Sequence, residues 1–181
     1  LRKYLAEHDD LALYCGTDPT GDSLHIGHLI PFMILKRFQM AGYHPVILIG
    51  GGTGAIGDPS GRKTERTLQT AEQVKHNEEK LTAQMKKLFG TENFEIRNNA
   101  EWLGKMNLLD FYGKFFQVNN MINKDVVASR LENGISFTEF SYQILQAIDF
   151  YHLNKDNGVQ MQIGGSDQWG NITAGIDLIH K

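Results

Sequence analysis

The run Pro-Val-Ile-Leu-Ile at residues 45–49 is apolar at every position and is followed directly by glycine. A short run without polar alternation predicts a strand, here over 46–50, that is covered on both faces, as in a parallel sheet. A second strand is expected over 11–16, and a largely apolar helix over 24–42 connects the two. Parallel neighbours require a crossover of this kind, and such crossovers are right-handed. The chain should therefore fold around a parallel α/β sheet.

The remaining sequence continues the alternation of strands and helices. In chain order we expect an amphipathic helix over 71–90, a strand over 94–97 and an interrupted helical region over 101–131. A helix over 137–152, a strand over 159–163 and a final helix over 167–180 follow. No internal repeat or linker divides the chain. These observations predict one domain over 1–181, with a Rossmann-like parallel sheet, helices on both of its faces, and a helical connective insertion at roughly 71–135.

Composition excludes several classes of protein. The 181 residues are 41% hydrophobic and include 18 Lys and Arg against 21 Asp and Glu, so the chain lacks the broad basic surface of nonspecific nucleic-acid binders. The single cysteine, Cys15, cannot form an internal disulfide, and no apolar run approaches the ~20 residues needed to span a membrane. An intracellular, cytoplasmic protein is expected. Because Leu1 already lies in a helix-like segment without a signal-like leader, we also expect the chain to start and stop within a longer protein.

Residues 52–57, Gly-Thr-Gly-Ala-Ile-Gly, match the spacing of a dinucleotide-binding turn. Such a turn must open a helix, yet Asp58-Pro59-Ser60-Gly61 follows, and this combination stops a helix rather than starting one. The match alone is therefore weak support for an NAD-dependent oxidoreductase.

The stretch of residues 18–28, Asp-Pro-Thr-Gly-Asp-Ser-Leu-His-Ile-Gly-His, joins a strand end to the start of a helix. The three-residue spacing of His25 and His28 places both imidazoles on one face at the helix N-terminus. Unpaired N–H groups there favour an anion such as a nucleotide phosphate, and Gly27 leaves room for it. The alternative is that both histidines are surface or capping residues. A zinc site is less favoured, because no further ligands occur at typical spacing.

A second glycine-rich turn, Gly-Gly-Ser-Asp-Gln-Trp-Gly-Asn at residues 164–171, follows the last expected strand. Ligands of open parallel sheets bind beyond the carboxyl ends of the strands, so this turn and the stretch over 18–28 should border one crevice. Asp167 is equally suited to accepting hydrogen bonds from ribose hydroxyls there and to capping the following helix.

Three polar residues, Tyr142, Gln146 and Asp149, are spaced i, i+4 and i+7, so they share one face of the helix expected over 137–152. Polar side chains on one stripe need water or a ligand to satisfy them. Periodicity alone favours water, and thus a solvent-exposed polar face.

Four blocks of sequence, taken in order, resemble class I aminoacyl-tRNA synthetases. They are YCGTDPTGDSLHIGH, GGTGAIGDPSGRKTER, GISFTEFSYQILQAIDF and QIGGSDQWGNIT. Over nearly its full length the chain is similar to the catalytic domain of bacterial-type tyrosyl-tRNA synthetases, truncated at both ends. The resemblance implies an ATP-dependent ligase that activates L-tyrosine and then transfers it to tRNA(Tyr). It also makes GTGAIG part of a substrate-side loop rather than a dinucleotide turn.

A tyrosine pocket follows from the resemblance. The implied set is Tyr14 and Asp149 at the phenolic hydroxyl, Asn99 and Trp102 as supports of that end, Gln168 beside the substrate backbone, and Asp58, Tyr142 and Gln146 at the ammonium group. With phenylalanine bound, Tyr14 and Asp149 would be buried and short of a partner. Each unsatisfied group costs about 1–3 kcal/mol, which favours tyrosine.

The reaction implied is attack of the tyrosine carboxylate on the α-phosphate of ATP, without a protein nucleophile. Catalysis would then depend on positioning and on donors aimed at developing charge. The implied ATP site comprises Thr20 and His25 at the pyrophosphate, Cys15, His28 and Asp167 at the ribose, Gly16, Asp18 and Gly165 near the nucleoside, Gly27 at the helix start, and Arg62, Lys63 and Arg66 as phosphate clamps. A charge-rich loop like the last is more often simply solvated. Mg²⁺ is expected with ATP, although the sequence offers no dedicated metal cage.

The chain departs from the family in what it lacks. The KMSKS-like loop that closes over ATP and the regions that recognise tRNA do not occur in the sequence. A second hypothesis is therefore a core that binds tyrosine but activates it poorly or not at all. The family forms a homodimer through this region, which makes Phe137 a candidate for a two-fold interface.

Overall fold

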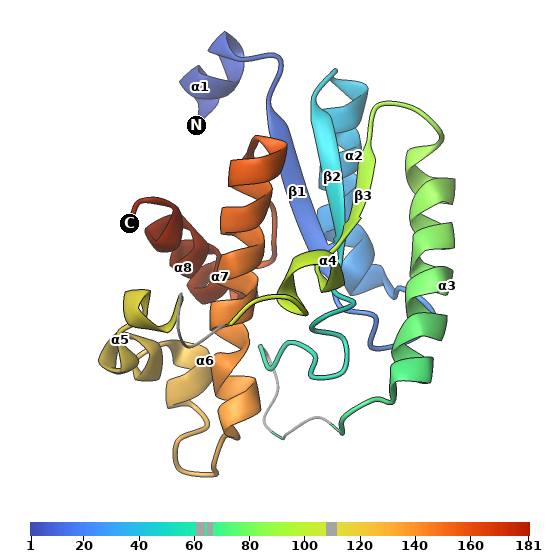
Figure 1. Ribbon diagram of the computed structural model, residues 1–181. Helices are drawn as coiled ribbons and strands as arrows, with labels where there is room; N and C mark the ends of the chain where they lie inside the picture. Colours follow the sequence, from blue (N-terminus) through green and yellow to red (C-terminus); the bar gives the residue numbers. More distant parts are fainter. Residues whose placement is uncertain (61–63, 65–66, 108–111) are drawn as a thin grey trace.

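The computed structural model describes residues 1–60, 64, 67–107 and 112–181. Its central feature is a sheet of four strands in the order β3-β2-β1-β4 (Figure 1). The strands are β1 (Ala12–Thr17), β2 (His44–Ile49), β3 (Glu95–Asn98) and β4 (Val159–Gln162). All three pairings between neighbours are parallel, which confirms the predicted α/β sheet.

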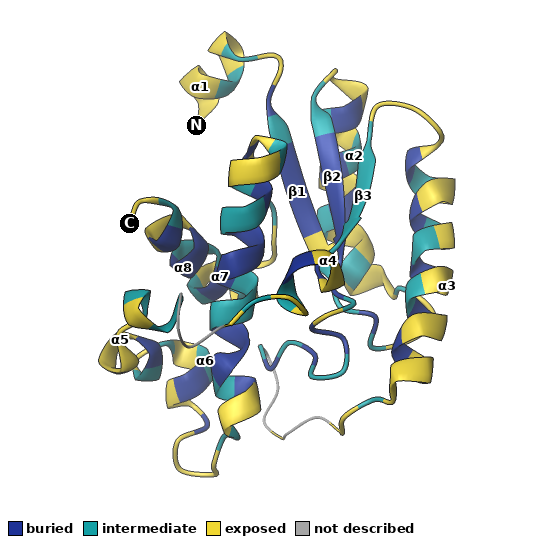
Figure 2. Ribbon diagram, in the orientation of Figure 1, coloured by how far each residue is buried: buried dark blue, intermediate teal, exposed yellow. Residues whose placement is uncertain are grey.

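Each face of the sheet carries its own hydrophobic core, because successive strand residues point to opposite faces. On one face, Leu13 and Ile47 pack against helices α2 (Ile26–Met40) and α3 (Ala71–Phe89). On the other face, Val46 and Leu48 pack against α7 (Phe137–Asn157) and α8 (Trp169–Ile179). Figure 2 shows β2 and most of β1 as buried, together with the inward sides of α3 and α7, whereas β3 is intermediate. The predicted helical layers on both faces are therefore confirmed.

The ends of the two long helices follow from local hydrogen bonding. Thr70 and Gln73 form a reciprocal capping box at the start of α3, and the Ser136 hydroxyl accepts from the Glu139 N–H at the start of α7. Helix α7 continues to Asn157, beyond the predicted end at residue 152. Leu153 still faces the core, and the first stop signal is Gly158, which has a left-handed φ of 64°.

Short helices lie between and before these longer elements. They are α1 (Arg2–Glu7), α4 (Ala100–Leu103), η2 (Gly113–Phe115), α5 (Val118–Ile122), α6 (Asp125–Ala128) and η3 (Ser166–Gln168). The interrupted helical region expected over 101–131 is thus a series of short helices. The last helix begins at Trp169 rather than at residue 167, because the 3₁₀ turn η3 precedes it.

The GTGAIG segment over 52–57 forms turns and does not open a helix, so it lacks the local structure of a dinucleotide-binding turn. The insertion expected at roughly 71–135 stays a prediction, and the α3 and β3 elements within that range belong to the sheet and its covering layer. Among the helices that the structure describes, none is both long and apolar enough to cross a membrane.

Candidate active site

A cavity of about 390 Å³ lies at the carboxyl ends of β1 and β4, where open parallel sheets bind ligands. It brings the two glycine-rich stretches together at one crevice, as the sequence predicted. The predicted site residues that line it are Tyr14, Cys15, Gly16, Asp18, Thr20, Gly27, His28, Asp58, Asn99, Tyr142, Gln146, Asp149, Gly165, Asp167 and Gln168. His25 lies outside this lining, and the predicted phosphate clamps Arg62, Lys63 and Arg66 lie outside the described residues.

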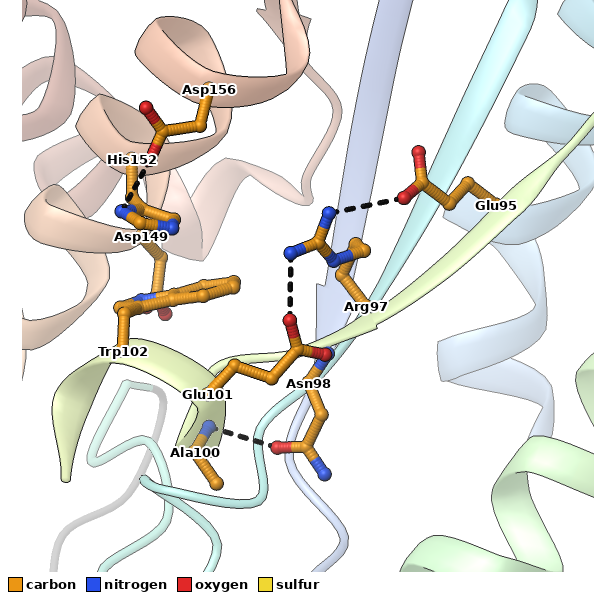
Figure 3. Close-up of polar contacts among 9 residues, drawn as sticks. All are labelled: Glu95, Arg97, Asn98, Ala100, Glu101, Trp102, Asp149, His152 and Asp156. Atoms are coloured by element: carbon orange, nitrogen blue, oxygen red, sulfur yellow. Dashed lines mark hydrogen bonds and ion pairs between the residues drawn. The ribbon is translucent and has the colours of Figure 1, made fainter. Parts of the chain in front are cut away.

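One end of the cavity holds a buried carboxylate. The side chain of Asp149 is on α7 and only 3% exposed, and its two oxygens accept hydrogen bonds from Trp102 Nε1 at 2.8 Å and Asn99 Nδ2 at 3.0 Å. Figure 3 shows the Trp102 indole edge facing this carboxylate. Burial raises the pKa of Asp149 to about 7, although the two hydrogen bonds oppose the shift. The Asp149 carboxylate is therefore a strong hydrogen-bond acceptor whose ionised form is disfavoured by burial.

The Tyr14 hydroxyl faces the same end of the cavity. Tyr14 is 1% exposed, and within the described part of the chain its hydroxyl has no hydrogen-bond partner. Burial, reinforced by the nearby Asp149 charge, raises the pKa of Tyr14 well above its usual value, so the hydroxyl keeps its proton. Buried hydroxyls are normally paired, so this one is suited to a hydrogen bond with a ligand.

The polar stripe of α7 lines the cavity and is not a solvent-exposed face. Tyr142 and Asp149 are buried, and Gln146 between them is half-buried. Periodicity could not distinguish water from a cavity, because both place polar groups on one side of a helix. The expectation of a solvated face is therefore wrong.

The opposite end of the cavity gathers two acidic side chains. The Tyr142 hydroxyl donates to Asp18 Oδ2 at 2.6 Å, and the Asp58 backbone N–H donates to the same oxygen at 2.9 Å. Gln168 Nε2 donates to Asp58 Oδ2 at 2.6 Å, and Gln146 Nε2 donates to Gln168 Oε1 at 3.1 Å. Burial, followed by the neighbouring Asp58 charge, raises the pKa of Asp18 to about 6, against the Thr53 and Tyr142 hydrogen bonds. Two adjacent carboxyl groups with restricted access to water favour a cationic ligand group.

Thr53 connects the two ends of the cavity, and sequence reasoning did not identify it. Its hydroxyl donates to Asp18 Oδ1 at 2.6 Å and accepts from Asn99 Nδ2 at 3.0 Å. Asn99 in turn bonds Asp149 and accepts from the Gly52 N–H at 2.7 Å. The GTGAIG turns thus link Asp18 to Asn99 and Asp149 from outside the cavity lining. Only the fold brings these distant positions together, so the sequence carried no direct signal for this role.

Gln162 lines the cavity, and sequence reasoning missed it as well. It is the last residue of β4, and its side-chain oxygen is buried without a partner among the described residues. Its position at a strand end, directly before the second glycine-rich turn, is a signal that would have identified it.

The start of α2 lies beside the cavity. His25 is the N-cap, with its Nδ1 accepting from the Gly27 N–H at 3.1 Å, and its ring stacks on His28 at 3.8 Å between centroids. The one-face prediction for the two imidazoles is confirmed, and His25 does cap the helix. The remaining first-turn N–H groups and the positive end of the helix dipole favour an anion at this edge of the cavity.

Two further predicted site residues, Cys15 and Asp167, also line the cavity. Cys15 is buried, and burial raises the pKa of its thiol to about 12, so it is a neutral lining group. Asp167 is exposed at the cavity rim and accepts from Gln168 Nε2 at 3.0 Å. It does not cap α8, because the N-cap of that helix is Gln168. The capping alternative for Asp167 is therefore wrong.

In the described residues, no group of three or more His, Cys, Asp or Glu side chains is arranged to hold a metal ion. Within the same described residues, the stacked His25 and His28 pair is not joined by further His, Cys, Asp or Glu ligands.

Comparisons with known proteins show which family this architecture belongs to. A family model described as tRNA synthetases class I (W and Y) matches residues 6–181. Tyrosine–tRNA ligases of Lactobacillus johnsonii and Lactobacillus helveticus are 98% and 94% identical to the chain over its full length. The chain spans 44% of the length of these curated relatives.

Solved structures agree with the sequence matches. A C-terminally truncated mitochondrial tyrosyl-tRNA synthetase of Aspergillus nidulans superposes with a TM-score of 0.86 and 34% identity, over 98% of this chain and 54% of that one. A tryptophanyl-tRNA synthetase of Plasmodium falciparum, with a TM-score of 0.71 and 19% identity over 97% of this chain and 47% of that one, shares the fold. The chain therefore belongs to the class I tRNA synthetases of the tryptophan and tyrosine (W and Y) family.

Proposed function

We propose that this chain is the amino-acid-activating part of a tyrosine–tRNA ligase, which joins L-tyrosine to ATP to form tyrosyl-adenylate and pyrophosphate. One observation carries the substrate assignment: the buried Asp149 carboxylate and the Tyr14 hydroxyl, which has no hydrogen-bond partner in the described part of the chain, lie at the same end of the cavity. The relatives named as tyrosine–tRNA ligases support the same activity.

Selection of tyrosine follows from satisfying this buried pair. The substrate phenol would donate to Asp149 and share a hydrogen bond with Tyr14, whereas phenylalanine would leave both groups without that partner. An unsatisfied buried group costs about 1–3 kcal/mol, and more when it is charged. Tryptophan offers no oxygen at the corresponding ring position, so the pair also argues against a tryptophan-specific site.

The ammonium group of tyrosine would lie at the acidic end of the cavity. Asp58, Tyr142 and Gln146 are placed there, with Gln168 linking Asp58 to Gln146. Because Tyr142 donates its proton to Asp18, its oxygen lone pairs remain available to accept from the ammonium. Binding both ends of tyrosine would fix the direction of its carboxylate.

Activation would then depend on how ATP lies beside that carboxylate. The N-terminus of α2 with Thr20 is suited to the phosphates, and His28, Gly16, Gly165 and Asp167 line the space for the ribose and the rest of the nucleoside. His25, Cys15, Asp18 and Gly27, and the clamps Arg62, Lys63 and Arg66, complete the proposed ATP site. Mg²⁺ enters with ATP as part of the substrate and neutralises phosphate charge. The protein side chains position the reactants and donate hydrogen bonds as pyrophosphate leaves.

The wider function is also proposed. The activated tyrosine would be transferred to tRNA(Tyr) in the cytoplasm by a homodimeric protein. Phe137, at the start of α7, is 71% exposed, which suits a two-fold interface.

Tyrosine-dependent exchange of pyrophosphate into ATP tests the activity, measured beside tyrosine binding by calorimetry on the same sample. A ligase should show both, and exchange should stop when tyrosine is omitted. Binding without exchange would favour the second hypothesis, a core that holds tyrosine but does not activate it. Absence of tyrosine binding would overturn both.

A further inference from the structure

His152 lies behind the phenol end of the proposed tyrosine site, outside the cavity lining. Its imidazole stacks on the Trp102 indole with ring centroids 4.4 Å apart and an angle of 27° between the planes. Figure 3 shows His152 and Asp149 on successive turns of α7, both reaching toward Trp102. Helix α7 therefore contacts the Trp102 indole at two points: Asp149 accepts a hydrogen bond from the indole edge, and His152 stacks on the indole face.

The His152 ring is itself held in place. Its Nδ1 lies 3.1 Å from Asp156 Oδ2, one turn further along α7 (Figure 3). This contact limits rotation of the ring, because an imidazole with one nitrogen bound to a carboxylate has a preferred orientation. Stacked aromatic rings stabilise each other by more than the area they bury.

Trp102 needs such support because its own helix is short. The α4 helix has only four residues, too few to be stable alone. Its start is fixed from the end of β3, where Asn98 Oδ1 accepts from the Ala100 N–H at 2.9 Å and Arg97 bonds Glu101 at 2.7 Å (Figure 3). These bonds fix the backbone of α4 but not the plane of the indole. Within the described contacts, it is His152 that stacks on that plane.

We propose that His152 is a positioning residue for tyrosine selection: it holds the Trp102 indole so that Nε1 donates to Asp149, whose carboxylate then accepts from the substrate phenol. The role rests on the proposed tyrosine site. Without the stack, the indole gains freedom and Asp149 loses one of its two observed donors for part of the time. The acceptor for the phenol would then be less well oriented, while the ammonium and phosphate ends would be unaffected.

Three variants of the full chain test this role. His152→Ala removes the ring, His152→Phe keeps a planar ring for Trp102 but removes the contact with Asp156, and His8→Ala is the matched control. His8 directly follows α1 and stacks on Tyr4 of that helix with ring centroids 4.0 Å apart, so its loss removes a comparable stack away from the cavity. Calorimetry measures tyrosine affinity, and displacement of tyrosine measures phenylalanine affinity.

We expect His152→Ala to bind tyrosine about 3- to 10-fold more weakly, the range that loss of one aromatic stack produces. Phenylalanine affinity should not change, His152→Phe should recover most of the tyrosine affinity, and His8→Ala should match the parent chain. Unchanged tyrosine affinity in His152→Ala would overturn the role. An equal loss for tyrosine and phenylalanine would also overturn it, because that result indicates general damage to the fold.

Fluorescence separates failure of this role from failure of the proposed function. The chain has two tryptophans, so Trp169→Phe leaves Trp102 as the sole indole reporter. If His152 holds the buried indole, adding His152→Ala should shift its emission to longer wavelength, whether or not tyrosine binds. A parent chain that does not bind tyrosine would refute the proposed function. Unchanged Trp102 emission would refute the support by His152.

Discussion

At the level of single residues, Asp149 would carry most of the chemistry at the phenol end of the proposed tyrosine site. Its pKa of about 7 means that the carboxyl group is largely protonated below that pH and ionised above it. An ionised carboxylate is the stronger acceptor for a phenolic O–H. Tyrosine affinity should therefore rise as the pH increases from about 6 to about 8. Ionisation of Asp18, whose pKa is about 6, should also raise the tyrosine affinity as the pH increases, because its charge would attract the substrate ammonium group.

Calorimetric titrations of tyrosine at several pH values check this dependence. Asp149→Asn is the control, because its side chain does not ionise and the remaining pH dependence should come from Asp18 alone. A tyrosine affinity that stays constant or falls over this range would contradict the assignment of Asp149 as the phenol acceptor.

Tyr14 offers a second test at the residue scale. Its hydroxyl has no partner among the described residues, so Tyr14→Phe should leave the free energy of unfolding unchanged or slightly raised. The same change removes one hydrogen bond to bound tyrosine and should weaken its binding about 3- to 10-fold. Denaturant unfolding and calorimetry measure the two effects separately. A large loss of stability with no loss of affinity would mean that Tyr14 is a core residue only.

At the level of elements, the contact between α7 and α8 positions both sides of the site. Gly175 of α8 lies so close to Phe150 of α7 that an added Cβ would be 2.9 Å from the phenylalanine side chain, including its Cβ. Gly175→Ala should therefore push the helices apart and lower the free energy of unfolding by about 1–3 kcal/mol. Tyrosine binding should also weaken, because Gln168 directly precedes α8.

Gly104→Ala is the matched control for this prediction, since its added Cβ would be 3.6 Å from the nearest atom, an ordinary contact. Thermal or denaturant unfolding of both variants measures the difference. Equal stability of the Gly175 and Gly104 variants would contradict close packing of α7 on α8.

The same elements show what the sequence can predict. Sequence patterns located the four strands to within two residues at each end. The signal was strongest for β2, a continuous apolar run that is buried from Pro45 to Ile49, whereas β3 and β4 mix apolar and polar residues and are mostly only partly buried. The region over 101–131 was less predictable. Its helices α4, α5 and α6 have four or five residues each, and such short helices depend on tertiary contacts rather than on a periodic pattern.

At the level of the whole molecule, the fold accumulates buried acidic groups at one cavity. Asp149 and Asp18 have folded-state pKa values of about 7 and about 6, above the ordinary value of 3.8. The folded chain therefore binds protons more tightly than the unfolded chain between about pH 4 and about pH 7. Through these two groups, the free energy of unfolding falls as the pH rises across that window.

Denaturant unfolding at pH values across this window checks the sign of the effect. Asp149→Asn removes one of the two groups, so the stability of this variant should fall less steeply with pH than that of the parent chain. Identical slopes for the two proteins would mean that Asp149 is already ionised at low pH in the folded state.

The site as a whole was only partly predictable. Resemblance to a known family supplied most of the lining residues, and the strand-end rule placed them at one crevice. The hydrogen bonds from Tyr142 to Asp18 and from Asn99 to Thr53 join positions 124 and 46 residues apart. Links of this length leave no periodic signal, so the roles of Asp18 and Thr53 in joining the two ends emerged only from the fold.

The most direct test of the account compares the affinities of tyrosine and phenylalanine for the chain, with Asp149→Ala measured in parallel. If the buried Asp149 and Tyr14 pair recognises the phenolic oxygen, tyrosine should bind at least about tenfold more tightly than phenylalanine, and Asp149→Ala should lose useful tyrosine binding. Equal affinities for the two amino acids, or unchanged tyrosine affinity in Asp149→Ala, would contradict the central claim.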